Sequence, residues 1–166
     1  MKSWLSTFDD LKIRLRALPY SEDTEFEGCD SDAIASLEAY AGCPFPGAYR
    51  SFLEIMGRKS GRLFKGSDAT YPGRFELRLR EQALKMLERK QAAFVLPENA
   101  FVFLTHQGYQ FLYFLLNEGD DPPVYHFGER QLTPKKISPH FTEYLSSFVS
   151  DLEALAAKHP ESFAPL

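Results

Sequence analysis

The stretch that decides the fold is IASLEAYAGCPFPGAYRSFLEIMG, residues 34 to 57. Ile34 and Leu37 share one helix face because they are three positions apart. Gly42 ends this first helix, and Pro46 suits the first turn of a second one, where a missing N–H costs nothing. The second helix repeats the apolar period at Tyr49, Phe52, Leu53 and Met56. The stretch therefore predicts a packed pair of helices and contains no catalytic residue.

Further elements are predicted on both sides of this pair, from hydrophobic periodicity and turn residues. They are an N-terminal helix over 3–18, the helical pair over 31–57, a charged helix over 75–91, a sheet over 101–128 and a C-terminal helix over 139–158. Together they predict one α+β domain over 1–166, in which a small, mainly antiparallel sheet packs with several helices. The long loop after Gly57 is expected to hold a short strand at 62–64.

The sheet is predicted to contain a hairpin, 101–105 with 109–116, followed by a strand from Val124 to Phe127. Both faces of the hairpin are apolar, so both need cover. Helices are expected on at least one face. The N-terminal helix covers the other face, or that face is a partner surface. In the C-terminal helix, Phe148 is predicted to be deeply buried because it lies among apolar neighbours.

Composition limits the class of protein. The chain has 166 residues, 44% of them hydrophobic and 14% aromatic, a composition that argues against disorder. No apolar run approaches the length of a membrane span, and the first residues do not resemble a secretory signal. Two isolated cysteines, Cys29 and Cys43, are then expected to be free thiols in a reducing cytoplasm.

Charge is unevenly distributed along the chain, although the net charge is only −4. Residues 17–49 contain seven acids and no lysine or arginine, whereas residues 50–90 contain eleven bases. Exposed acids without neighbours to neutralise them are candidates for steering a charged partner. The candidate partner-binding acids are Glu22, Asp23, Glu25, Glu27, Asp30 and Asp32, with a second group in the turn at Glu118, Asp120 and Asp121.

Three tyrosines on neighbouring predicted strands are the other candidate partner-binding residues: Tyr109, Tyr113 and Tyr125. Tyrosine is enriched at binding hot spots. The alternative for each is a place at the edge of the core with its hydroxyl toward water.

Motifs for catalysis, metals or cofactors are not found. The four histidines have no metal-ligand spacing, and neither cysteine has a Cys-x-x-Cys partner. The basic loop at 58–65 resembles neither a complete phosphate loop nor a nucleophile elbow. An enzyme of unrecognised type or a nucleic-acid binder using this loop is a less favoured alternative, since a pI near 5.6 is unusual for nucleic-acid binding. We expect no metal, no cofactor, no nucleic acid and no enzymatic activity.

Two motifs resemble the SUKH superfamily of Smi/Knr-like proteins, over roughly residues 30 to 157. The first consists of Ile34, Leu37, Glu38, Pro46, Tyr49, Arg50, Phe52, Leu53 and Gly57. The second is the hairpin followed by Pro123, Val124 and Tyr125. The sequence departs from the family pattern at Met56, where an Asn is common, and around Phe114, where an acidic residue is common.

The resemblance implies a SUKH-like fold and a cytoplasmic immunity protein that binds and neutralises a cognate toxin, of nuclease or deaminase type. The acidic residues are compatible with this role because toxins that act on nucleic acid tend to have basic clefts. The same resemblance leaves a regulatory scaffold of the Smi/Knr type as an alternative. Neither the identity of the toxin nor the oligomeric state follows from the sequence.

Overall fold

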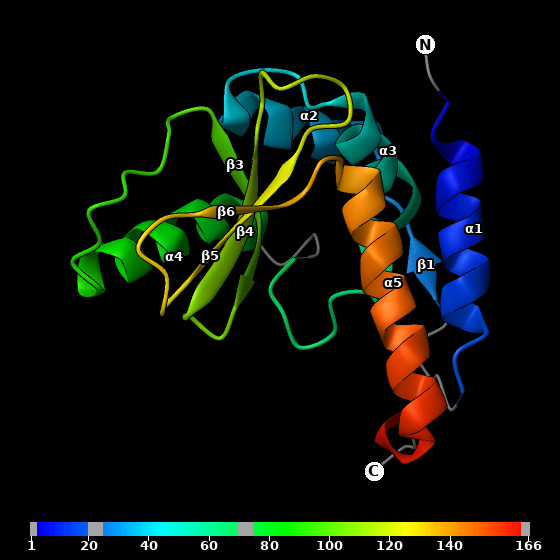
Figure 1. The fold of residues 1–166 in the computed structure, drawn as a ribbon. Coiled ribbons are helices and arrows are strands. Elements are labelled where there is room, and N and C mark those ends of the chain that lie inside the picture. The colour runs from blue at the N-terminus through cyan, green and yellow to red at the C-terminus, as the bar shows by residue number, and fades with distance from the viewer. Residues whose placement is uncertain (1–2, 20–24, 70–74, 164–166) are drawn as a thin grey trace.

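The computed structural model describes residues 3–19, 25–69 and 75–163, which form an α+β fold (Figure 1). Its helices are α1 (Leu5–Arg16), α2 (Ser31–Ala41), α3 (Gly47–Met56), α4 (Phe75–Arg89) and α5 (Phe141–Lys158), with a final 3-10 turn η1 (Pro160–Phe163). Its strands are β1 (Phe26–Glu27), β2 (Lys59–Ser60), β3 (Ala100–His106), β4 (Gln110–Leu115), β5 (Val124–Gly128) and β6 (Lys135–Ser138). The predicted fold class is confirmed.

The main sheet is antiparallel with the strand order β3-β4-β5-β6. The sheet extends beyond the predicted end at residue 128, because β6 adds a fourth strand. This strand is short, and the residues Lys135, Lys136 and Ile137 within it are exposed. It therefore lacks the apolar run or alternation by which strands are detected in a sequence. A register shift between Val124 and Tyr125 interrupts its pairing with β5.

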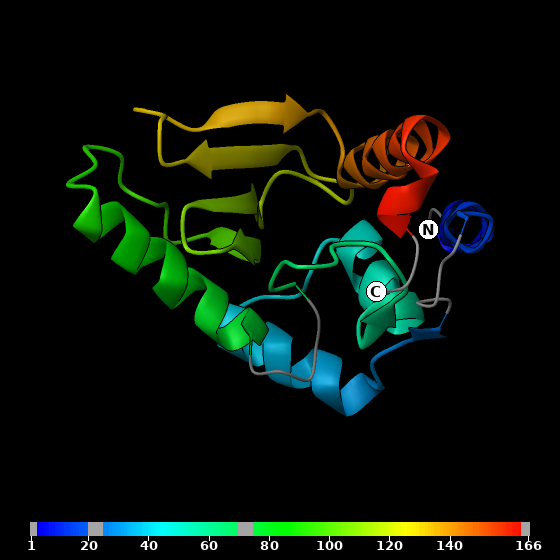
Figure 2. The ribbon, with the colours of Figure 1, turned by 90° about the horizontal axis from the view of Figure 1, so that it is seen from below.

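Helices cover both faces of the sheet. Alternate strand residues, such as Phe103 and Phe114, pack with α3 and α5 in one hydrophobic cluster, whereas Val102 and Tyr113 pack with α4 in a second cluster. Figures 1 and 2 show α4 on the opposite side of the sheet from α5. The second face is thus covered by α4, and α1 instead packs outside α3 and α5.

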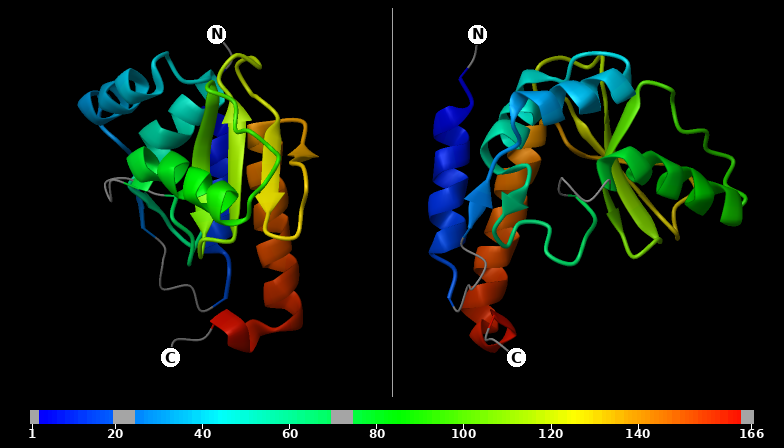
Figure 3. Two further views of the ribbon diagram at one scale, coloured as in Figure 1. Left: turned by 90° about the vertical axis from the view of Figure 1, so that its left-hand side faces the viewer. Right: turned by 180° about the vertical axis from the view of Figure 1, so that it is seen from behind.

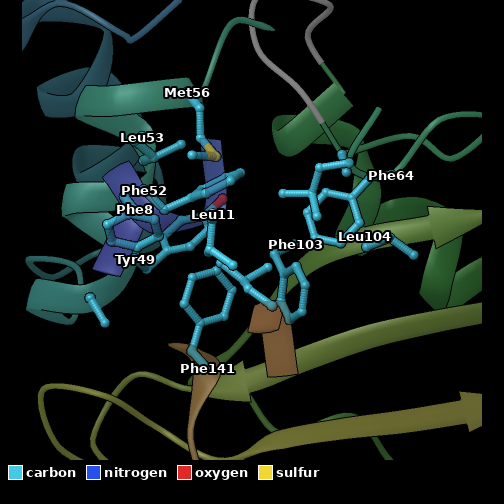
Figure 4. Close-up of a cluster of buried hydrophobic side chains, with 14 of the residues drawn as sticks. Phe8, Leu11, Tyr49, Phe52, Leu53, Met56, Phe64, Phe103, Leu104 and Phe141 are labelled. Carbon is cyan, nitrogen blue, oxygen red and sulfur yellow. The ribbon is translucent and has the colours of Figure 1, made fainter. Parts of the chain in front are cut away.

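Tyr49 of α3 is the centre of the larger cluster (Figure 4). Its ring centroid lies 5.0 Å from that of Phe114, 5.4 Å from Phe141 and 5.9 Å from Phe52. These rings come from a strand and two helices. Close-packed aromatic pairs add to the free energy of burial, so this cluster fixes α3 and α5 against the sheet.

The prediction that Phe148 is deeply buried is wrong. The residues of α5 that face the core are four positions apart: Phe141, Leu145 and Val149 are fully buried. Phe148 lies one position before Val149, which rotates its side chain by about 100° around the helix. It is partly buried and packs at the rim of the cluster, 5.3 Å from the ring of Phe64.

Helix α1 runs alongside α5 in the same direction (Figure 3). Arg14 joins the two helices. Its guanidinium donates two hydrogen bonds, 2.8 and 2.9 Å long, to the carboxylate of Glu153, and it also donates to the hydroxyls of Ser146 and Ser150. The Glu153 hydrogen bond raises the pKa of Arg14.

The chain between α3 and α4 begins with β2, which pairs with β1 in a two-stranded sheet. The strand predicted at 62–64 is wrong, because residues 61–66 form turns. Strand β1 approaches α3 closely. A Cβ atom at Gly28 would lie 1.8 Å from the Glu54 carbonyl oxygen, and the amide of Cys29 donates to the Leu53 carbonyl at 2.7 Å. Cys29 is buried, Cys43 is half-buried, and both are free thiols.

Candidate partner-binding surface

The acidic residues in and just before β1 lie beside a base that is distant in the sequence. Glu22 and Asp23 lie outside the described residues. Lys59 of β2 is 2.7 Å from the Glu25 carboxylate and 3.6 Å from that of Glu27. The acidic block has no base near it in the sequence, but a base distant in the sequence partly offsets its charge in the fold. Pairing of β1 with β2 brings the start of the basic segment against the acidic one, and sequence distance had concealed this contact.

Asp30 has a structural role at the start of α2. One carboxylate oxygen accepts the Ala33 amide at 2.8 Å, which caps the helix, and the other accepts Arg58 at 3.0 Å. The hydrogen bond from Ala33 and then that from Arg58 lower the pKa of Asp30. Asp32 follows in the first turn, is exposed, and forms no ion pair with any described residue. Asp32 is thus the member of the block whose charge is least offset.

Tyr113 and Tyr125 stack on each other within the sheet, with ring centroids 5.2 Å apart. Tyr113 is only 4% exposed, so its ring belongs to the core under α4. Burial raises its pKa to about 12. Tyr125 is half-buried, and its hydroxyl donates to the Glu118 carboxylate at 3.0 Å. Tyr125 is therefore the member of this pair that reaches the surface.

Tyr109 is separate from the stacked pair. It lies in the turn between β3 and β4, is 39% exposed, and makes an edge contact with the ring of His106. The three tyrosines do not form one surface, although they were predicted on neighbouring strands.

The acidic turn holds the first turns of two helices. The Asp120 carboxylate accepts the Gly47 amide at 2.8 Å, at the start of α3. The Asp121 carboxylate accepts the amide and the hydroxyl of Thr142, at the start of α5. These carboxylates replace caps that Pro46 and His140, at the N-cap positions, do not supply. Glu118, the third acid of this turn, caps neither of these two helices.

The basic loop forms one wall of a hollow of about 420 Å³, lined by Arg58, Lys59, Ser60, Lys65 and neighbouring residues. Arg58 and Lys59 are engaged with Asp30 and Glu25. Arg62 lies over the ring of Phe163, 4.3 Å from its centre. The cationic side chains of Arg58, Lys59 and Arg62, which a phosphate ligand would need, are thus already engaged within the protein.

His126 of β5 is half-buried. It lines a hollow of about 440 Å³ beside Tyr109 and Arg130. Its Nε2 lies 2.9 Å from Gln110 Oε1 and its Nδ1 lies 3.1 Å from Gln131 Nε2. Gln131 Oε1 accepts the Gly128 amide, so its Nε2 donates to His126, and the ring is neutral with its proton on Nε2. Burial and then Lys135 lower its pKa. With both nitrogens bonded, the ring has no free position to act as a base.

A metal site is not formed by the described part of the chain: it contains no group of three or more histidine, cysteine, aspartate or glutamate side chains placed to hold an ion. Within the same residues, no helix is long and apolar enough to cross a membrane.

These elements define an α+β domain whose sheet is covered on both faces and whose candidate site is a surface, not an enclosed cleft. The chain belongs to the SMI1 / KNR4 family (SUKH-1), whose model matches residues 28–147. A comparison with curated proteins found no match. The family match begins after α1, so α1 and most of the length of α5 that it contacts lie outside the matched range.

Proposed function

We propose that this protein is a cytoplasmic immunity protein that binds a cognate toxin and blocks its activity without catalysis. The observation that carries the proposal is the family match over residues 28–147, because immunity to toxins is the role that this resemblance implies. The state of His126 supports a non-catalytic role, since both of its ring nitrogens are already bonded.

Exposed carboxylates supply the proposed attraction to the toxin. A toxin that cleaves or modifies nucleic acid needs a basic cleft, and an acidic partner is steered into such a cleft. Asp32 is exposed on α2, and Glu25 and Glu27 remain exposed despite their contacts with Lys59. We assign the long-range attraction to these three residues, together with Glu22, Asp23 and Asp30.

A second part of the proposed interface lies at the exposed end of Tyr125. Its hydroxyl is held by Glu118, so the ring has a fixed orientation without a partner. A rigid tyrosine beside a carboxylate suits a basic partner surface, because little conformational entropy is lost on binding. Tyr109, Asp120 and Asp121 are assigned supporting contacts, and Tyr113 acts through the stacking that holds Tyr125.

The test is neutralisation of the toxin encoded next to this gene. The toxin domain is expressed under a repressible promoter, with and without this protein, and cell survival and complex formation are measured. We expect survival only with this protein, and a one-to-one complex by size-exclusion chromatography with light scattering. A neighbouring toxin that neither binds this protein nor is inhibited by it would contradict the proposal and favour a regulatory scaffold of the Smi/Knr type.

A further inference from the structure

A hollow of about 260 Å³ lies at the outer edge of β3, between the end of α2 and α4. Its apolar lining comes from Phe101, Val102 and Leu116. Tyr40 of α2 and Glu98, which precedes β3, also line it. Neither Tyr40 nor Glu98 is among the residues assigned above.

Main-chain groups of β3 face this hollow. The amide of Ala100 donates to the Pro97 carbonyl, and the Ala100 carbonyl accepts Arg80 at 2.8 Å, so both groups point away from β4. Val102 is two residues further along in the same register, and its main-chain groups point the same way. At the far end of the strand, the amide and carbonyl of Thr105 are paired with Asp68. The Val102 carbonyl therefore lies between two satisfied positions, and no described residue outside the sheet donates to it.

The charged groups around the hollow are not equivalent. Glu98 is exposed and forms no ion pair with a described residue. Arg80 is half-buried and is held by the Ala100 carbonyl. Tyr40 is 47% exposed. The hollow thus combines an unpaired carboxylate, a carbonyl acceptor and an aromatic ring.

We propose that this hollow receives an arginine side chain of the toxin. This inference rests on the proposed function and adds a specific anchor to it. The guanidinium pairs with Glu98, donates to the Val102 carbonyl and stacks on Tyr40. A guanidinium has five N–H donors, no acceptor and a flat face that stacks on aromatic rings, which matches these three groups. Arg80 carries the same charge as the incoming arginine and repels it. The Glu98 carboxylate has to offset this repulsion, so binding depends on Glu98.

Other guests fit these groups less well. An anion would be attracted by Arg80 but repelled by Glu98. An apolar side chain would leave the Glu98 carboxylate and the Val102 carbonyl without donors in a partly desolvated place, which is unfavourable. Arginine is also among the residues enriched at interface hot spots.

The test uses a probe and does not require the toxin. Nα-acetyl-arginine N-methylamide is titrated into isotope-labelled protein, and amide chemical shifts are followed by NMR. The matched probe is the citrulline amide, which has the same shape without the charge. We expect saturable shifts at Tyr40, Glu98, Ala100 and Val102 with the arginine probe. Affinity for citrulline should be lower by on the order of tenfold, because hydrogen bonds to charged groups are the stronger ones.

Variants separate this hollow from other surfaces. Glu98→Gln should weaken the arginine probe by a similar factor, and Tyr40→Ala should weaken it as well. Glu88→Gln is the matched control, since Glu88 is exposed and lies outside the lining; this variant should bind the probe as the wild type does. A thermal melt confirms that each variant folds. Equal affinity for both probes, an unchanged affinity in Glu98→Gln, or shifts centred elsewhere would overturn the inference.

The same variants distinguish failure of this inference from failure of the proposed function. If the arginine probe binds here but the neighbouring toxin is not inhibited, the immunity role is wrong and the arginine anchor for that toxin is wrong with it. If the toxin is inhibited equally well by wild type and Glu98→Gln, and the probe does not bind, only the arginine anchor is wrong.

Discussion

The Asp121 carboxylate holds the first turn of α5 through Thr142: one oxygen accepts the Thr142 amide at 3.0 Å and the other accepts its hydroxyl at 2.6 Å. Asp121 and Thr142 are 21 residues apart in the sequence. Asp120, the preceding residue, does the same for α3 at Gly47. One short turn after β4 thus caps two core helices, and two of the acids predicted to bind a partner stabilise the fold.

Asp121→Ala should lower the free energy of unfolding by about 1–2 kcal/mol, the range for losing a helix cap. Urea unfolding followed by circular dichroism measures this. Glu118→Gln is the control from the same turn, because the Glu118 carboxylate accepts from the Tyr125 hydroxyl and caps none of the described helices. Equal stability of Asp121→Ala and wild type would show that the cap is not needed.

Gly28→Ala should detach β1 from α3, because the new Cβ atom would lie 1.8 Å from the Glu54 carbonyl oxygen. The cost should reach the upper end of the roughly 1–3 kcal/mol found for overpacking. The buried thiol of Cys29, next in the chain, should then react faster with a thiol dye in the native protein. A Cys29 thiol that reacts no faster in Gly28→Ala than in wild type would contradict this close contact.

Phe141→Ala should cost about 3–5 kcal/mol, as for a fully buried phenylalanine. Phe148→Ala should cost less, about 1–2 kcal/mol, because the ring is only partly removed from water. The two variants remove the same atoms from one helix, so denaturant midpoints compare them directly. A larger loss of unfolding free energy in Phe148→Ala than in Phe141→Ala would mean that the face of α5 described here as buried is not the one that packs against the core.

Stability should decrease as pH falls, with a contribution from His126. Its pKa is lowered in the folded protein, so the unfolded chain takes up a proton first. The contribution of His126 to the free energy of unfolding is fully present above the pKa of about 6.5 that this histidine has in the unfolded chain. It is lost as pH falls through that value toward the lower pKa of His126 in the folded protein. His126→Gln should have a smaller difference in unfolding free energy between pH 7.5 and pH 5.5.

Asp32→Asn should slow association with the toxin more than it speeds dissociation, because an exposed charge acts mainly by steering. Glu25→Gln should have a smaller effect, since Lys59 already offsets that charge. The difference should shrink at high salt, as screening limits exposed charges to about 8 Å at physiological ionic strength. Surface-binding kinetics at two salt concentrations measure this. An unchanged association rate of Asp32→Asn at low salt would remove this block from the steering surface.

The helices and the hairpin follow from local patterns in the sequence. The pair around Gly42 is an example: this glycine has φ +79°, a backbone conformation that suits glycine, and ends α2. The fold class was predictable because such signals depend on neighbours within a few positions. Strand β6 was not, because Lys135, Lys136 and Ile137 are all exposed and its burial pattern has no period of two.

Site residues were harder to assign because their roles depend on distant contacts. The neutralisation of Glu25 requires Lys59, 34 positions later, and the burial of Tyr113 requires α4. Nothing near Asp121 in the sequence indicates that Thr142 is its partner. The arginine-sized hollow beside Glu98 likewise needs α2, α4 and β3 together. Charge and aromaticity identify candidates, whereas tertiary contacts decide which of them remain available.

Strand β6 has a consequence for solubility. It forms the outer edge of the sheet, where unpaired main-chain groups invite pairing with another molecule. Its residues Lys135 and Lys136 are exposed, and the register shift at Val124 and Tyr125 distorts the edge. In an antiparallel pairing of two such edges the lysines would face one another, which like charges disfavour. The edge is thereby protected from growth into aggregates, and concentrated solutions should remain monodisperse longer than those of a variant with both lysines changed to threonine.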